Sequence, residues 1–193
     1  MFYSIIVFIL VAAAYVAWEL NAVKNATIMD IMKDFVDVSP CVLMLCFNKP
    51  YCIIFLAFCL MANEFIYDNQ ILGGLLFITA YASASVLSSM YFDFKLVNLI
   101  ICLIVMLFTE VPILLIYKGS VSEKITIGIY GILSLCPCLY AFSVTFNVGF
   151  MLLALGDIWL GIYGAMNNKC IKIVANLFYF AGTCFVPLIL RSV

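Results

Sequence analysis

Three polar residues lie inside apolar segments of this chain and could do chemistry together. Asp157 and Glu64 are carboxylic acids, and Tyr81 is a phenol. An ionised carboxylate in hydrocarbon costs several kcal/mol unless it is paired, solvated or protonated. We therefore expect Asp157 to face the interior of a helix bundle and to form part of a functional site. The alternative is a buried acid that a hydroxyl group or a lysine satisfies, with no chemistry.

Small residues share the predicted helical face of Asp157. Ala154, Gly161 and Gly164 come three residues before, four after and seven after it, which is the spacing of one side of an α-helix. Small side chains let neighbouring helices approach closely in a membrane. This spacing predicts that Asp157 points into protein and not into lipid.

The positions of the three polar residues within their segments predict a common depth. Asp157 comes nine residues after Val148, or roughly 14 Å at about 1.5 Å per residue. Glu64 comes thirteen residues after Tyr51, or roughly 20 Å from the same side. Tyr81 lies roughly 16 Å from that side in a hydrocarbon core of about 30 Å. The two acids and the phenol are therefore expected to meet near the middle of the bilayer.

Two neighbouring carboxylates suit acid–base chemistry. Both cannot easily stay ionised at short distance, so that one would serve as an acid and the other as a base. Such a pair can protonate a substrate while it activates a water molecule, and Glu64 and Asp157 are the candidates. The alternatives are an acid pair that only locks two helices together and a Tyr81 that only packs.

The composition is that of an integral membrane protein. The chain has 193 residues, of which 68% are hydrophobic, whereas a soluble domain is nearer half apolar. Its net charge of −1 favours neither nucleic acid nor an anionic surface as a partner. Histidine is absent, which excludes the usual zinc hydrolase, Ser-His-Asp and Cys-His sites. We expect no metal and no cofactor, and we expect the nine cysteines to act mostly as small hydrophobic residues.

Apolar segments follow one another along the whole chain, with no soluble domain between them. The sequence predicts an all-α fold, a single polytopic membrane helix bundle of about eight transmembrane helices over residues 1–193. About seven remain if the short second segment, expected to start near Lys33, does not span. The first segment is expected to be a retained helix, because no Lys or Arg precedes it as in a signal peptide. The expected helices are 2–18, 35–47, 51–67, 71–91, 96–117, 125–142, 147–166 and 173–190. Bends are expected at Pro112 and Pro137. The expected polar loops are 21–34, 118–124 and 167–172.

Lysines are concentrated on one side of this expected bundle. The loops after the first, third, fifth and seventh segments hold more Lys and Arg than the opposite loops, which predicts that they are cytoplasmic. The chain is therefore expected to be an integral, multi-pass membrane protein. Its cysteine and asparagine content and its retained first helix favour the endoplasmic reticulum as that membrane.

Several short motifs together resemble those of the YhhN family of membrane proteins, which includes the animal lysoplasmalogenases. Gly156-Asp157 is similar to a motif of the family's seventh helix, and Asn63-Glu64 falls at a Gly-Asp late in the third. Gly73-Gly74-Leu75-Leu76-Phe77 is similar to the glycine-rich start of the fourth helix. Lys33 resembles a lysine near the start of the second helix, and Phe178-Tyr179 resembles a Tyr-Tyr in the last. The resemblance covers nearly the whole chain.

The resemblance implies hydrolysis of the vinyl-ether bond of a lysoplasmalogen, which releases a fatty aldehyde and a glycerophospho-head group. It implies about eight transmembrane helices, a lysophospholipid substrate and the lipid bilayer as partners. Two positions differ from the family pattern, because Ala80-Tyr81 stands in place of Ala-His and Gly182 in place of a glutamine.

Three functions are open at this point. A lysoplasmalogenase-like hydrolase would use Glu64 and Asp157 as acid and base, with Tyr81 orienting water. Lys33 would meet the phosphate group, and Tyr179 would line the substrate site. A catalytically silent lipid-binding or lipid-sensing protein is the second function, which the two replaced positions favour. A small transporter with Asp157 as its coupling acid is the third. The oligomeric state is left open.

Overall fold

The computed structural model describes residues 2–22, 25–45, 57–59, 61–62, 70–91 and 95–186 of the chain. Within these residues the secondary structure is helical, with short connections and no strand, which confirms the expected all-α fold. Most of the expected helix 51–67, including Glu64, lies outside the described residues. The long helices are α1 (Phe2–Glu19), α2 (Ala26–Leu45), α4 (Gln70–Tyr91), α5 (Leu96–Ile116), α6 (Val121–Thr145), α7 (Val148–Met166) and α8 (Lys169–Phe185).

Four of these helices are long and apolar enough to cross a membrane. They are α1, α5, α6 and α7, and each carries few charged residues. In α4 a shorter apolar stretch covers Leu72–Ser83. These apolar helices are compatible with an integral membrane protein. The expected count of about eight spans is not confirmed by the part of the chain that the structure describes.

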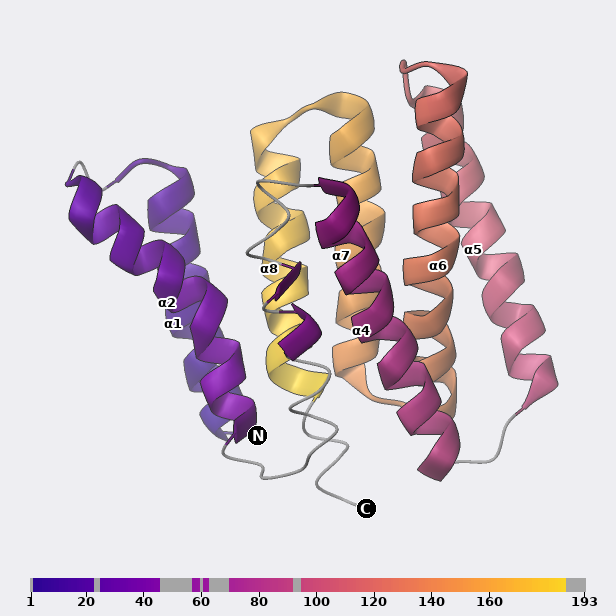
Figure 1. The fold of residues 1–193 in the computed structure, drawn as a ribbon, viewed down its shortest axis with the longest axis horizontal. Helices are drawn as coiled ribbons and strands as arrows, with labels where there is room; N and C mark the ends of the chain where they lie inside the picture. The colour runs from indigo at the N-terminus through magenta and orange to yellow at the C-terminus, as the bar shows by residue number, and fades with distance from the viewer. Residues whose placement is uncertain are drawn as a thin grey trace.

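Helices α6 and α7 lie at the centre of the bundle, and the other helices pack around them (Figure 1). Helices α4 and α5 pack on α6, whereas α8 packs along α7. The hairpin of α1 and α2 lies on the outer side of α8. The connections α1–α2, α5–α6 and α7–α8 lie together at the upper end in Figure 1, so that neighbouring helices run antiparallel.

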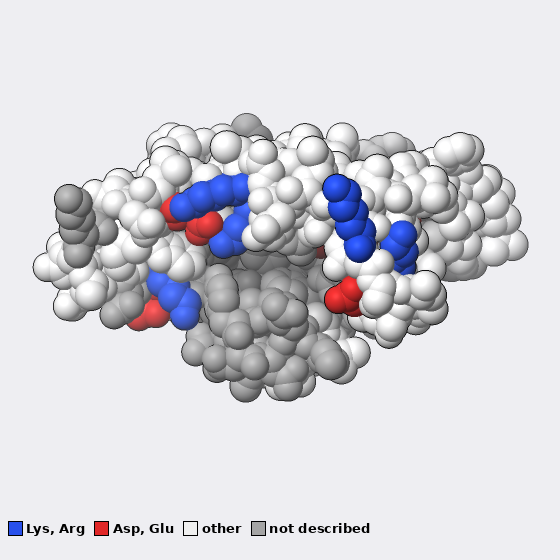
Figure 2. Space-filling view, turned by 90° about the horizontal axis from the view of Figure 1, so that it is seen from above, with Lys and Arg blue, Asp and Glu red and all other residues white. Residues whose placement is uncertain are grey.

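Basic side chains gather at this upper end of the bundle (Figure 2). Lys118 lies in the connection between α5 and α6, and Lys124 is in the first turn of α6. Lys169 and Lys172 are in the first turn of α8. Lys95, in contrast, precedes α5 at the opposite end. The helix arrangement thus gathers these four lysines at one end, as the spacing along the chain predicted.

Capping residues start two helices earlier than the sequence predicted. The Glu123 amide donates to Ser120 Oγ at 3.3 Å, and the Ser120 amide donates to Glu123 Oε2 at 2.6 Å. This capping box starts α6 about one turn earlier than expected, within the predicted loop 118–124. Asn25 Oδ1 accepts a hydrogen bond from the Ile28 amide at 3.3 Å and starts α2 about two turns earlier than expected. Asn25 and Ser120 are therefore helix caps, and the loops before α2 and α6 are shorter than the predicted 21–34 and 118–124.

Two clusters of buried residues form the core. One joins α4, α6 and α7 and includes Tyr81, Leu135 and Leu153. The other joins α1, α2 and α8 and includes Val11 and Phe180. Tyr179 of α8 packs against both clusters. The two halves of the bundle therefore meet at α7 and α8, around the helix that carries Asp157.

Candidate functional site

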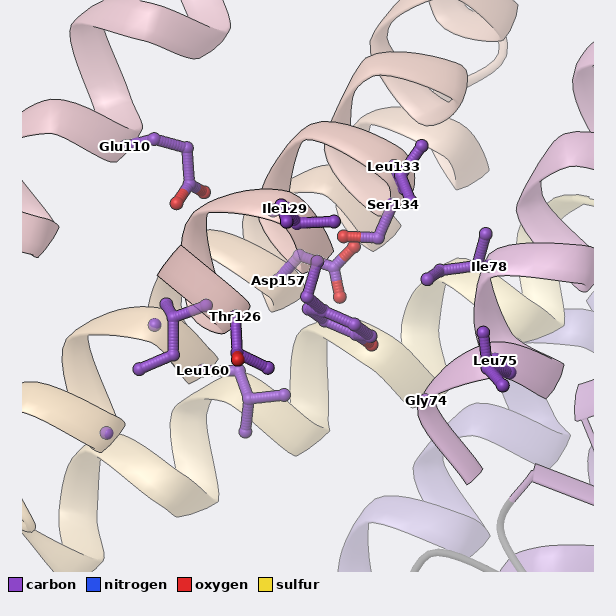
Figure 3. Close-up of a pocket in the computed structure, with 15 residues that line it drawn as sticks. Gly74, Leu75, Ile78, Glu110, Thr126, Ile129, Leu133, Ser134, Asp157 and Leu160 are labelled. Carbon is purple, nitrogen blue, oxygen red and sulfur yellow. The ribbon is translucent and has the colours of Figure 1, made fainter. Parts of the chain in front are cut away.

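Asp157 of α7 points into the bundle toward α6. Its Oδ2 atom and the Oγ atom of Ser134 are buried, and neither makes a well-aligned hydrogen bond among the described residues, although the two side chains adjoin each other. Figure 3 shows the Ser134 hydroxyl group turned toward the Asp157 carboxyl group. Ser134 is fully buried, whereas Asp157 keeps some surface toward neighbouring cavities. Buried polar atoms are nearly always satisfied in native proteins. Asp157 also lines two cavities, which bring a ligand or water next to the residue.

Glycines let the neighbouring helices approach α7 closely around Asp157. A Cβ atom at Gly156 would lie 3.2 Å from the Ala175 carbonyl oxygen and from the Tyr179 amide nitrogen, both in the backbone of α8. A Cβ atom at Gly161 would lie 3.2 Å from the side chain of Ile113 in α5. Close helix packing therefore fixes the rotation of α7, and with it the direction of the Asp157 side chain.

A first cavity, the apolar cavity, lies between α4, α5, α6 and α7 and has a volume of about 450 Å³. Its walls are mostly aliphatic or glycine, with Leu75, Ile129 and Leu133 partly exposed at its rim. Two acids line it, Asp157 and Glu110 (Figure 3). The volume falls within the range of small-molecule sites in proteins. The apolar cavity can therefore hold an alkyl chain with a reactive group next to an acid.

Glu110 is a site residue that the sequence analysis did not single out. It is on α5, two residues before Pro112, and it is 8% exposed. Its carboxyl group faces Gly131 of α6 so closely that an added Cβ atom would collide with it. An acid within an apolar segment was the available signal, because such residues usually face a bundle interior or a water-filled cavity. The predicted partner of Asp157, Glu64, lies outside the described residues.

A second cavity, the aromatic cavity, lies on the other side of Asp157 and has a volume of about 190 Å³. Tyr81 and Tyr179 both line it. Phe77 of α4 packs against both rings, with centroids 6.2 Å from Tyr81 and, edge to face, 5.4 Å from Tyr179. Asp157, Tyr130 and Leu160 line both cavities. Asp157 is thus at the junction of an apolar and an aromatic compartment.

The aromatic cavity also has a polar part, which α8 supplies. Lys172, Asn176 and Tyr179 line it at the spacing of one helical face. Lys172 Nζ lies 2.9 Å from Glu19 Oε1 of α1. The Asn176 side-chain amide donates to the Tyr15 hydroxyl group at 2.5 Å. The spacing of Lys172, Asn176 and Tyr179 along the sequence predicts that they share one face of a helix. The sequence does not predict their partners on α1, because these are more than 150 residues away.

The structure brings together three of the predicted site residues. Asp157, Tyr81 and Tyr179 line the aromatic cavity. Lys33 is on α2 and is not among the described residues that line either cavity, so that Lys172 is the basic residue of this site.

Comparison of the chain with protein families, with curated proteins and with solved structures finds no match. The resemblance to the YhhN family therefore rests on the short motifs alone.

Asp157 combines an acid with two cavities that it lines. Ser134 and Asp157 offer a buried hydroxyl group and a buried carboxyl group that make no well-aligned hydrogen bond in the described part of the chain. Both lie next to a cavity large enough for water and for part of a ligand. A proton donor that is held in place beside its substrate contributes a factor of about 10² to 10⁴ to a reaction rate.

Proposed function

We propose that this chain is an intramembrane hydrolase of a single-chain lipid, in which Asp157 is the proton donor. One observation carries the proposal: Asp157 joins the apolar and the aromatic cavity, and its buried Oδ2 makes no well-aligned hydrogen bond among the described residues. The substrate that fits the motifs is an alkenyl lysophospholipid, with its chain in the apolar cavity. The enzyme would be lysoplasmalogenase-like.

The reaction is the addition of water across a vinyl ether. Asp157 donates a proton to the outer vinyl carbon, which leaves an oxocarbenium ion at the carbon next to the ether oxygen. Water adds to that carbon and loses a proton to a base, and the hemiacetal then breaks into an aldehyde and a free glycerol hydroxyl group. Tyr81 and Ser134 lie next to Asp157 and would orient the water. Glu64 is the predicted base.

The membrane arrangement that accompanies this proposal has about eight spans, with the lysine-rich upper end in the cytoplasm. The endoplasmic reticulum is the proposed membrane. Four apolar helices support an integral membrane protein, and the gathering of lysines at one end of the bundle supports the proposed orientation.

The test is turnover of an alkenyl lysophospholipid by the purified chain in detergent, measured as released aldehyde. We expect Asp157→Asn to lower turnover at least about a hundredfold, because it removes the proton donor and keeps the side-chain shape. The matched control is Asp34→Asn, which neutralises an exposed acid on α2 and should leave turnover unchanged. Equal turnover in wild type and Asp157→Asn would reject the assigned role.

A second pair of variants identifies the base. We expect Glu64→Gln to lower turnover at least about a hundredfold and Glu110→Gln to lower it far less. The opposite order would make Glu110, which shares the apolar cavity with Asp157, the second acid of the reaction.

A catalytically silent lipid-binding protein is the second candidate function, and Gly182 favours it. In the resembled family a glutamine stands at this position, but a Cβ atom here would lie 2.6 Å from Leu153 Cγ. The packing between α7 and α8 thus leaves no room for a longer side chain. Binding of the alkenyl lysophospholipid without aldehyde release would support this second function.

A further inference from the structure

Glu110 is a buried carboxyl group to which the proposed hydrolysis assigns no step. It is 8% exposed, and it makes no hydrogen bond or ion pair with another described residue. Its carboxyl group points from α5 toward α6, where it lies against Gly131 and lines the apolar cavity (Figure 3). The Thr126 hydroxyl group lines the same cavity but donates to the Ser122 carbonyl oxygen at 3.0 Å. Glu110 is therefore a buried acid that is open to a ligand in the cavity.

Among the described residues, the charged groups that line the apolar cavity are both acids. Glu110 and Asp157 line it, whereas none of its described lining residues is a lysine or an arginine. Lys172 lines the aromatic cavity instead, and its Nζ atom is 2.9 Å from Glu19 Oε1. A cation near a carboxylate stabilises the ionised form of that group, whereas an anion opposes it. The apolar cavity therefore favours a positively charged ligand.

The other walls of the apolar cavity suit an alkyl chain. Leu75, Ile129 and Leu133 line it and are 55%, 53% and 45% exposed, so that they border the outer surface of the bundle. Apolar walls of this kind stabilise a chain that leaves water. Tyr130 also lines the cavity, and its ring lies against Gly74 of α4, where an added Cβ atom would be 3.4 Å from Cε2. Because an aromatic face attracts cations as well, these walls fit a ligand with one apolar chain and one cationic group.

We propose that the apolar cavity binds a single-chain lipophilic amine. The ammonium group contacts the carboxyl group of Glu110, with Asp157 as the second acid of the same cavity, and the alkyl chain lies along Leu75 and Leu133. The cavity volume of about 450 Å³ is in the range of sites for small molecules. The inference does not rest on the proposed function, because no bond of the amine is broken. An amine in this cavity would exclude the alkyl chain of a lysophospholipid substrate.

The test is the binding of radiolabelled dodecylamine, dodecanol and dodecanoic acid, which share one alkyl chain length and differ in the charge of the polar group. The protein is held in phosphatidylcholine nanodiscs, and empty nanodiscs measure the share of each probe that enters the lipid alone. We expect the wild type to bind dodecylamine about tenfold more tightly than dodecanol, and dodecanoic acid more weakly than either. Glu110→Gln keeps the size of the side chain and should reduce the preference for the amine below about threefold. Asp34→Asn, which neutralises an exposed acid on α2, should behave like wild type.

Equal affinity of the wild type for dodecylamine and dodecanol would overturn the inference, whether or not the variants fold. Dodecanoic acid that binds as tightly as the amine would overturn it as well, because the cavity would then not select a cation. A full preference for the amine in folded Glu110→Gln would place the ammonium group elsewhere and reject the assigned site. The result is separate from that of the hydrolase test, because none of the three probes has a vinyl ether.

Discussion

Gly131 of α6 lies directly against the carboxyl group of Glu110 in α5. No side-chain atom fits between them, because a Cβ atom at this position would overlap the carboxyl group. Both residues line the apolar cavity that Asp157 shares. The absence of a side chain at Gly131 therefore leaves room for the second acid of the cavity directly against α6.

The contact predicts the effect of Gly131→Ala. We expect the free energy of unfolding to fall by about 1 to 3 kcal/mol, because the buried carboxyl group must move to make room. Turnover should fall at least about tenfold, because the wall of the cavity shifts. The measurements are the thermal midpoint in detergent and aldehyde release.

Gly164→Ala is the control for this substitution. It also lines the apolar cavity, but its added Cβ atom would lie 3.9 Å from the Tyr117 ring, which is ordinary contact. We expect its stability to be unchanged or up to about 1 kcal/mol higher, because alanine favours a helix. Equal destabilisation by both substitutions would contradict the role of the contact between Gly131 and Glu110.

The buried hydroxyl group of Ser134 predicts a separation of stability from function. Ser134→Ala removes a buried polar atom that makes no well-aligned hydrogen bond among the described residues and only adjoins the Asp157 carboxyl group, so that the thermal midpoint should change little. Turnover should fall about tenfold, because the hydroxyl group turned toward Asp157 would no longer orient water.

Ser85→Ala should show the reverse pattern. The Ser85 hydroxyl group donates to the Pro137 carbonyl oxygen at 2.7 Å and links α4 to α6. Its loss should lower stability by about 0.5 to 1.5 kcal/mol and leave turnover nearly unchanged. Identical behaviour of the two serine variants would mean that Ser134 has only a structural role.

Tyr81→Phe tests the phenol that lines the aromatic cavity with Asp157. The ring is 2% exposed and packs near Phe77, and phenylalanine keeps this packing. We expect kcat to fall about tenfold while KM changes little, because only the group that orients water is removed. Tyr140 is near the C-terminal end of α6 and is not among the described residues that line either cavity. Tyr140→Phe should therefore leave both constants unchanged. A rise in KM alone would instead assign Tyr81 to substrate binding.

Asn147 connects the start of α7 to the end of α8. Its Oδ1 atom accepts from the Gly149 amide at 2.5 Å, and its Nδ2 atom donates to the Val186 carbonyl oxygen at 3.0 Å. Asn147→Ala should lower the free energy of unfolding by about 1 to 3 kcal/mol, because both buried backbone groups lose their partner. The thermal midpoint in detergent measures this effect.

Asn168→Ala is the matched substitution at the start of α8. Asn168 caps that helix through the Cys170 amide at 2.9 Å in an exposed position. Water can replace this bond, so that the loss should be nearer about 0.5 to 1 kcal/mol. A loss at Asn168 equal to that at Asn147 would show that capping alone, and not the link to Val186, accounts for the effect.

Much of the fold and part of the site follow from local sequence. Long apolar segments predict membrane helices, since only helices satisfy their backbone groups within one segment. Small residues spaced around Asp157 predicted that it faces protein, and the structure has it in the bundle interior. Both properties depend on residues within a few turns of each other. The starts of α2 and α6 are also local, but they depend on caps at Asn25 and Ser120 that hydropathy does not register.

Only the tertiary structure decided which distant side chains share a cavity. Glu110 joins Asp157 because α5 and α7 both pack beside α6, and Lys172 meets Glu19 because α1 packs on α8. Lys33, which the sequence predicts to meet a phosphate group, is on α2, and no described residue of α2 lines either cavity. A partner across the bundle depends on the rotation of each helix and on which helices are neighbours. Both are determined by the fit of whole helix surfaces, which no local pattern specifies.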